Sequence, residues 1–467
     1  MTKQKSFIRG LGLFDSTMIV AGSMIGSGIF IVSADITRQV GSPFWLLVVW
    51  VITGLLTITA ALSYGELATL FPTAGGQYIY LREAHGPVFG FLYGWTLFLV
   101  IQTGTIAAVA VGFSKFFGVL VPAISADNII FSLGPVMLSS QRFVAIIVIV
   151  LLTFTNTLGV ETGKIVQNIF TATKITAFVL LIALALFIVD RSDAALHAAD
   201  FFAPKLWIDN TWQNLAPIAL MAALGTATVG SLFSSDAWNN IGFAAAEVKE
   251  PHKTVPRAMI FGTLAVTGLY LLANFSYISV LSMDGIASAR EDRVATAVAA
   301  TIFGNHAAVI MAVAIMISTF GCANGLILAG ARVYYAMAEH GLFFKKIGQL
   351  NGKGVPANGL MLQGLWATAL VLSGSYGNLL DYVIFAALLF YVLTVWGVFV
   401  LRKKRPELAR PYKAWGYPVV PLLYIVIASL VMIDLLIYKP VYTWPGLGLV
   451  LTGLPVYWFW HKKNRYD

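Results

Sequence analysis

The chain has 467 residues, of which 58% are hydrophobic and 11% are charged, and its formal net charge is +9. A soluble domain has roughly 45–50% apolar and about 25% charged residues, so this composition excludes a water-soluble globular fold. Its basic residues are spread over short segments between apolar runs, which argues against nucleic-acid binding. The single cysteine, Cys322, excludes an intrachain disulfide.

Apolar runs of about 20 residues recur along the chain, the length that a helix needs to cross roughly 30 Å of hydrocarbon. Lipid offers the backbone no hydrogen-bond partners, so we expect an all-α integral membrane protein. The twelve predicted spans are 12–33, 43–70, 87–121, 142–160, 165–189, 215–247, 257–281, 305–337, 357–374, 378–401, 418–438 and 442–461. Most Lys and Arg residues fall in the tails and in alternate loops, which predicts cytoplasmic N- and C-termini in the cell membrane.

Two spans, the first and the sixth, are interrupted by small and polar residues at 22–28 and 234–240. Such residues also permit close helix packing, which is the simpler interpretation of the glycines. Paired breaks five spans apart, however, indicate the midplane binding site of an inverted-repeat transporter. The pattern predicts a first five-helix repeat over 1–189, an inverted repeat over 190–401, and two extra helices with a tail over 402–467.

The broken helices can bind both charges of an amino acid. Unwinding the first span leaves free amides at Ser27 and Gly28, at the positive end of a half-helix, where a carboxylate is stabilised. Free carbonyls before this break and in the sixth span would suit an ammonium group. Backbone groups alone can therefore hold a zwitterion.

These residues resemble the amino acid–polyamine–organocation superfamily, within it the L-type amino acid transporters and their bacterial relatives. The resemblance covers nearly the whole chain and rests on motifs at 22–30, 71–78, 166–174, 232–240 and 247–257. It implies the five-plus-five inverted repeat, the leucine-transporter-like fold, with two extra helices. The vertebrate members bind a glycoprotein partner through a cysteine after span three. The corresponding loop, 116–141, has none, so we expect no disulfide-linked partner.

The resemblance also implies residue roles. Gly26, Ser27 and Gly28 would bind the substrate carboxylate, and carbonyls near Gly22 and Phe233 would bind its amino group. Phe233 would close over the substrate as a gate. The substrate-binding residues inferred from these motifs are Gly22, Met24, Gly26, Ser27, Gly28, Phe233, Asp236 and Asn239.

Lys174 lies near the middle of the fifth span. An ammonium costs about 2.5–3.5 kcal/mol at this depth, which makes the lysine a functional candidate, although its side chain could instead snorkel to the interface. The resemblance implies that Lys174 stands where sodium-driven relatives place a cation. It would bridge the first span to the eighth, with the hydroxyl of Ser318 as its partner.

Four further polar residues allow two interpretations each. Asp236 could cap the second half of the sixth span or meet the substrate ammonium. Asn239 could contact the substrate, or it could cap a helix or form a hydrogen bond between helices. Glu66 and Arg332, near the inner ends of spans two and eight, are either gate residues or interfacial charges.

The predicted function is sodium-independent exchange, or facilitated transport, of small or neutral L-amino acids by alternating access. The alternatives are a proton-coupled symporter, in which Lys174 carries the proton, and an amino acid sensor that does not transport. No metal-ligand cluster, nucleophile elbow or phosphate loop stands in a suitable context, so we expect no enzymatic activity, cofactor or metal.

Overall fold

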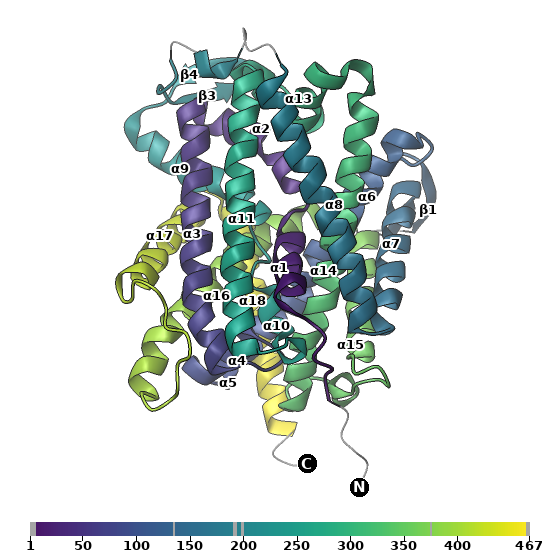
Figure 1. The fold of residues 1–467 in the computed structure, drawn as a ribbon, viewed down its shortest axis with the longest axis vertical. Coiled ribbons are helices and arrows are strands. Elements are labelled where there is room, and N and C mark those ends of the chain that lie inside the picture. Colours follow the sequence, from purple (N-terminus) through teal and green to yellow (C-terminus); the bar gives the residue numbers. More distant parts are fainter. Residues whose placement is uncertain (1–5, 134–135, 190–193, 198–199, 374–375, 464–467) are drawn as a thin grey trace.

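The computed structural model describes residues 6–133, 136–189, 194–197, 200–373 and 376–463. Its helices form one bundle, and both termini lie at the same end (Figure 1). Two antiparallel hairpins join helices of the bundle. The first pairs β1 (Ile129–Leu133) with β2 (Val136–Ser139), and the second pairs β3 (Lys205–Ile208) with β4 (Thr211–Asn214). The second hairpin lies at the end opposite the termini (Figure 1).

Within the described residues, nine helical stretches are long and apolar enough to cross a membrane. They are α3 (Pro43–Leu70), α5 to α6 (Pro87–Leu120), α7 (Ser140–Thr157), α8 (Val160–Phe187), α9 (Pro217–Ser234), α11 (Pro251–Val280), α13 to α14 (Val294–Glu339), the Val383–Lys404 part of α16 (Tyr376–Lys404), and α17 (Val419–Tyr438). The remaining predicted spans correspond to the N-terminal broken helix, α15 (Ala357–Ser373) and α18 (Pro440–Lys463). The chain is therefore a multi-pass, all-α membrane protein.

Both predicted breaks are present. The first span consists of α1 (Leu13–Met24), an unwound segment, the 3-10 turn η1 (Gly28–Phe30) and α2 (Val32–Val40), so it extends beyond the predicted end at residue 33. The sixth consists of α9, a second unwound segment, α10 (Asn240–Phe243) and η4 (Ala245–Glu247). At the first break the Gly26 amide donates to the carbonyl of Met24 at 2.9 Å, which departs from the helical i to i−4 pattern.

Several short elements were not predicted as helices. They are α4 (Gln77–His85), α12 (Met283–Ala287) and α13 (Val294–Phe303), with the 3-10 turns η3 (Ala195–His197), η5 (Arg290–Asp292), η6 (Gly304–His306) and η7 (Lys345–Gly348). The third span also contains a π-helical stretch, η2 (Leu97–Ile101), between α5 (Pro87–Thr96) and α6 (Gln102–Leu120). Such π-segments are rare and occur often at functional sites.

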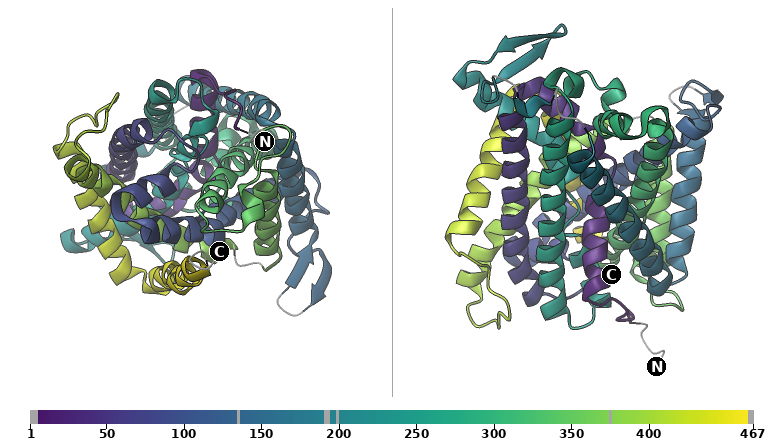
Figure 2. Two further views of the ribbon diagram at one scale, coloured as in Figure 1. Left: turned by 90° about the horizontal axis from the view of Figure 1, so that it is seen from below. Right: turned by 45° about the horizontal axis from the view of Figure 1, so that its top comes forward.

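The helices differ in how deeply they lie in the bundle. Each stretch has its own most apolar window of 18 residues. This window is 72% buried in the α5–α6 stretch and only 28% buried in α17. Viewed from the end that holds the termini, the C-terminal helices, coloured yellow, lie on the rim (Figure 2). The α14 helix (Ala307–Glu339) packs against α1, α6 and α8. The broken helices are therefore central, and α17 faces outwards.

Candidate substrate site

The first break exposes the backbone groups that the sequence predicts. Among the described residues, the amides of Ser27 and Gly28 donate to no carbonyl. Gly28 lies against the end of α9, because a Cβ at this position would meet the Ser234 hydroxyl at 2.2 Å. The two broken helices are therefore in direct contact at the predicted carboxylate site.

Gly22 faces away from the second break. A Cβ there would lie 2.0 Å from Nε2 of Gln167 and 2.2 Å from the hydroxyl of Thr171, both on α8. For this glycine the packing interpretation accounts for the missing side chain, because any larger residue would collide with α8.

Lys174 of α8 is buried, with 2% of its surface exposed, and it does not snorkel. Its ammonium donates to the carbonyl oxygens of Gly22 and Ile25, both at 2.6 Å, and to that of Ser318 at 3.2 Å. The Ser318 hydroxyl instead donates to the carbonyls of Ile25 (3.0 Å) and Gly26 (3.2 Å). The predicted bridge from α1 to α14 is present, but its predicted hydroxyl partner is wrong. The backbone carbonyl of Ser318 accepts the bond, and the Ser318 hydroxyl acts as a donor to the first break.

The carbonyls predicted to be free for a substrate ammonium have hydrogen-bond partners within the protein. The Tyr270 hydroxyl of α11 lies within hydrogen-bond distance of the Met24 carbonyl (3.1 Å) and of the Ser234 carbonyl (3.0 Å). The Phe233 carbonyl accepts the amide of Asp236 at 3.2 Å. Unwinding removes a carbonyl's helical partner, and in a buried site another donor of the protein must replace it. Tyr270 thereby connects both breaks, a role that nothing in its local sequence indicates.

The polar residues of the second break are bound to neighbouring helices. Asp236 accepts a hydrogen bond from the Tyr391 hydroxyl of α16. It does not occupy the cap position of α10, which is Asn239, and the cap interpretation is therefore not supported. Asn239 uses its side-chain amide for an interhelical bond to Oε1 of Gln77 in α4, at 2.8 Å.

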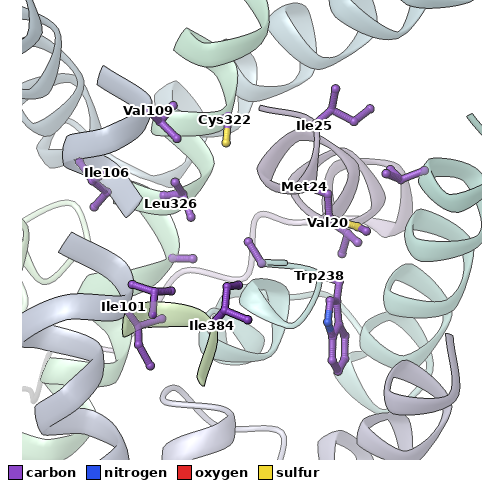
Figure 3. Close-up of a cluster of buried hydrophobic side chains, with 14 of the residues drawn as sticks. Val20, Met24, Ile25, Ile101, Ile106, Val109, Trp238, Cys322, Leu326 and Ile384 are labelled. Atoms are coloured by element: carbon purple, nitrogen blue, oxygen red, sulfur yellow. The ribbon is translucent and has the colours of Figure 1, made fainter. Parts of the chain in front are cut away.

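The aromatic side chains differ in burial. Phe233 is half-buried against the core, whereas Trp238 is 2% exposed and packs edge-to-face on Tyr64 at 4.7 Å. Figure 3 shows Met24 of α1 on the same side as Trp238, facing apolar side chains of η2, α6 and α14. Trp238 is not among the site residues predicted from the sequence.

The cavities beside the second break are small. Two cavities of about 20 Å³ each lie beside the second break, and both are lined by Asp236, Ala387 and Tyr391. Each has room for about one water molecule. Gln102, Thr105 and Asn239 add polar groups to one of them. The site is therefore closed in this conformation.

A larger cavity, of about 820 Å³, opens near the end that holds the termini. It is lined by Ser6, Phe7, Arg9, Pro72, Thr73, Ala74, Ile79, Arg82, Ala246, Tyr335, Ala336, Glu339 and His340. None of these residues belongs to either break. The loop before α4 packs on α10, where the Gly75 amide donates to the Phe243 carbonyl at 3.0 Å. The motif at 71–78 thus lines this cavity with Pro72, Thr73 and Ala74 and contacts the second break through Gln77.

Two buried carboxylates brace the same end. Glu247, after α10, pairs with Arg332 of α14 at 2.8 Å, and each side chain is 1% exposed. The Leu11 amide, before α1, donates to the Glu247 carbonyl at 3.0 Å. Glu66 of α3, also 1% exposed, pairs with Arg402 of α16 at 2.6 Å. The sequence selected Glu66 and Arg332 but could not identify their partners.

The family and the relatives agree with this geometry. Residues 11–454 match the model of a family described as amino acid permease. The large neutral amino acids transporter small subunit 2 of Mus musculus is 31% identical over 97% of this chain and 82% of its own length. The human b(0,+)-type amino acid transporter 1 is 30% identical over 99% of this chain and 90% of its own length. The chain belongs to the amino acid permease family.

Proposed function

We propose that the protein exchanges small or neutral L-amino acids across the membrane, without sodium, by alternating access around the two broken helices. The observation that carries this proposal is the Lys174 ammonium at the first break. The relatives support the substrate class, since their names denote amino acid transporters.

The ammonium accounts for the absence of a sodium requirement. Unwound backbone carbonyls are the groups that coordinate sodium in transporters with broken helices. Here the carbonyls of Gly22, Ile25 and Ser318 surround the Lys174 ammonium, which carries the same charge as sodium. A positive charge fixed to the chain repels a second cation and cannot dissociate. The gradient of the substrate itself then drives transport.

The substrate carboxylate binds the backbone of Gly26, Ser27 and Gly28, where the amides of Ser27 and Gly28 are available. The amino group is held at the facing ends of α1 and α9, near Gly22, Met24 and Phe233, once the site opens. Each carbonyl there has a second lone pair. Phe233 closes over the bound molecule. Asp236 and Asn239 shape the cavity beside the second break, and Asp236 disfavours acidic side chains.

The position in the cell follows from the same proposal. Both termini, with the Glu247–Arg332 and Glu66–Arg402 pairs, lie at the cytoplasmic end of a plasma-membrane protein with five-plus-five repeats over 1–189 and 190–401. The protein works without a disulfide-linked subunit, because its single cysteine, Cys322, is buried and donates to the Ser23 carbonyl at 3.0 Å.

Uptake of labelled amino acids into proteoliposomes tests the proposal. We expect rapid uptake into vesicles preloaded with neutral amino acid, slow uptake into empty ones, and no effect of replacing sodium by choline. Equal uptake into empty and preloaded vesicles would contradict exchange. If an inward proton gradient drove accumulation into empty vesicles, proton-coupled symport would replace exchange as the proposed function.

A further inference from the structure

Residues 402–418 comprise the end of α16 and the connection to α17, and we call them the turn. They are folded around a buried carboxylate. Glu66 of α3 pairs with Arg402 at 2.6 Å and with Arg410 at 3.3 Å. It also accepts the Ala414 amide at 2.7 Å. The Arg402 guanidinium stacks over the Tyr417 ring, 3.6 Å from its centroid. These contacts attach both ends of the turn to one point, so its surface is preformed.

The outer surface of this turn is basic. Lys403 and Lys413 are exposed, and neither has an acidic partner among the described contacts. They are chain neighbours of Arg402 and Ala414, which bind the same Glu66 carboxylate, so their backbones lie near this carboxylate. Residues 402–418 hold six Lys and Arg residues and one acidic residue, Glu407.

An apolar surface continues from this patch along α16. Trp396 is 47% exposed and lies seven residues before Lys403, on the same face of the helix. Its ring stacks on Phe399 at 5.4 Å, and Phe399 packs on Tyr417 at 5.0 Å. Trp415, 70% exposed, lies within the turn itself, as expected for an indole at the membrane interface.

We propose that this turn is a binding site for an anionic phospholipid. Its phosphate lies between Lys403 and Lys413, and one acyl chain follows Trp396 and Phe399. Three observations favour a lipid. The basic patch ends a membrane span, the aromatic surface leads from it along the span, and the neighbouring α17 has only 28% of its most apolar window buried. Clusters of Lys and Arg beside a span attract acidic headgroups. This proposal does not depend on the transport function.

Native mass spectrometry of the full chain in neutral detergent tests the site, with phosphatidylglycerol and phosphatidylcholine as probes. We expect the wild type to retain phosphatidylglycerol in preference to phosphatidylcholine. Lys403→Gln with Lys413→Gln should weaken phosphatidylglycerol binding by about 30-fold, from the usual contribution of two surface lysines. The matched control is Lys249→Gln with Lys353→Gln, which removes the same charge from exposed positions at the same end. Its affinity for phosphatidylglycerol should stay within about twofold of the wild-type value. This change is smaller than the loss of one contacting lysine would cause.

Three results would overturn the proposal. They are equal retention of both lipids by the wild type, equal losses in the two double variants, and displacement of phosphatidylglycerol by millimolar inorganic phosphate, which would identify a soluble phosphate site. If the Lys403 and Lys413 variant does not fold, a salt titration of the wild type decides. Binding of phosphatidylglycerol should fall steeply with ionic strength, because exposed charges are screened. A salt-independent interaction would exclude a headgroup held by lysines.

Discussion

At the scale of single residues, Lys174 connects three helices that are far apart in the sequence. Its ammonium binds carbonyls of α1 and α14, and the Ser318 hydroxyl adds a second connection between the same two helices. The first break is therefore held by Lys174 from α8 and by Tyr270 from α11. A side chain can shift the balance between two conformations only if it interacts differently with them. Both residues are placed to do so.

We predict that Lys174→Ala slows exchange at least tenfold, which raises the activation free energy by roughly 1.4 kcal/mol or more. The affinity for external substrate should change by less than about threefold, or under about 0.7 kcal/mol in binding free energy. The ammonium is bound to backbone carbonyls rather than to the available amides of Ser27 and Gly28. Initial rates in proteoliposomes and binding to the purified protein measure the two effects.

The pH dependence of the same variant distinguishes two roles of Lys174, as a fixed connection between helices or as a proton carrier. If Lys174 carries the proton, wild-type uptake should rise steeply between about pH 8 and pH 5, and the variant should be flat. If Lys174 is only a fixed connection between helices, uptake need not depend on pH in this range. An unchanged maximal rate in a folded Lys174→Ala protein would refute both.

Gly28 offers a second prediction at this scale. Gly28→Ala should weaken substrate binding at least tenfold, because the new methyl group would collide with the Ser234 hydroxyl at 2.2 Å and separate the two breaks. Ser234→Gly in the same chain removes the obstacle and should restore most of the affinity. Isothermal binding measurements on the single and double variants test this. If the double variant were as weak as Gly28→Ala, the collision would not be the cause.

At the scale of elements, the two broken spans are connected to each other and to α14 near the end that holds the termini. The segment after α10 is held by the Glu247–Arg332 pair, and the segment before α1 joins it through the Leu11 amide. Leu11 also accepts the Lys249 amide at 2.8 Å. The ends of the two broken spans on the side of the termini therefore move as one unit, or they separate by breaking these bonds.

We predict that Glu247→Gln destabilises the protein by about 3–5 kcal/mol, because it leaves the guanidinium of Arg332 buried without its counter-ion. Glu247→Gln combined with Arg332→Met should cost less than the sum of the single changes, since the double variant has no buried unpaired charge. Chemical unfolding in micelles gives the three free energies. Strictly additive losses would show that the two residues act independently.

At the scale of the whole molecule, hydropathy predicted the spans well because the membrane imposes one length and one composition on every helix. Span 43–70 matches α3 residue for residue, and the breaks occur where glycines and serines interrupt the first and sixth spans. The site was less predictable. Tyr270, Tyr391 and Gln77 act through partners distant in the sequence, and local patterns carry no information on such pairs.

The same distinction explains the errors in the predicted site. The family resemblance implied that Lys174 and Ser318 would meet, but not that the ammonium would bind the carbonyl of Ser318 rather than its hydroxyl. Likewise, unwinding predicted free carbonyls, whereas the fold supplies Tyr270 and Lys174 to satisfy them. A backbone group's final partner depends on the tertiary arrangement.

A prediction at this scale concerns assembly. Cys322→Ser should transport normally and should migrate like the wild type on non-reducing gels, because the buried thiol donates only to the Ser23 carbonyl, which a hydroxyl can also do. Membranes from the expressing cell provide the sample. A higher-mass band in the wild type that reducing agent removes, and that Cys322→Ser lacks, would demonstrate a covalent partner.

The fixed ammonium at the first break has a consequence for the cell that contains this carrier. A sodium ion could enter with each substrate and leave on the other side, but Lys174 remains with the chain through every cycle. If the proposed exchange holds, each imported molecule is matched by an exported one. The protein would then change the composition of the internal amino acid pool but not its size, and a scarce amino acid would enter only when an abundant one departs.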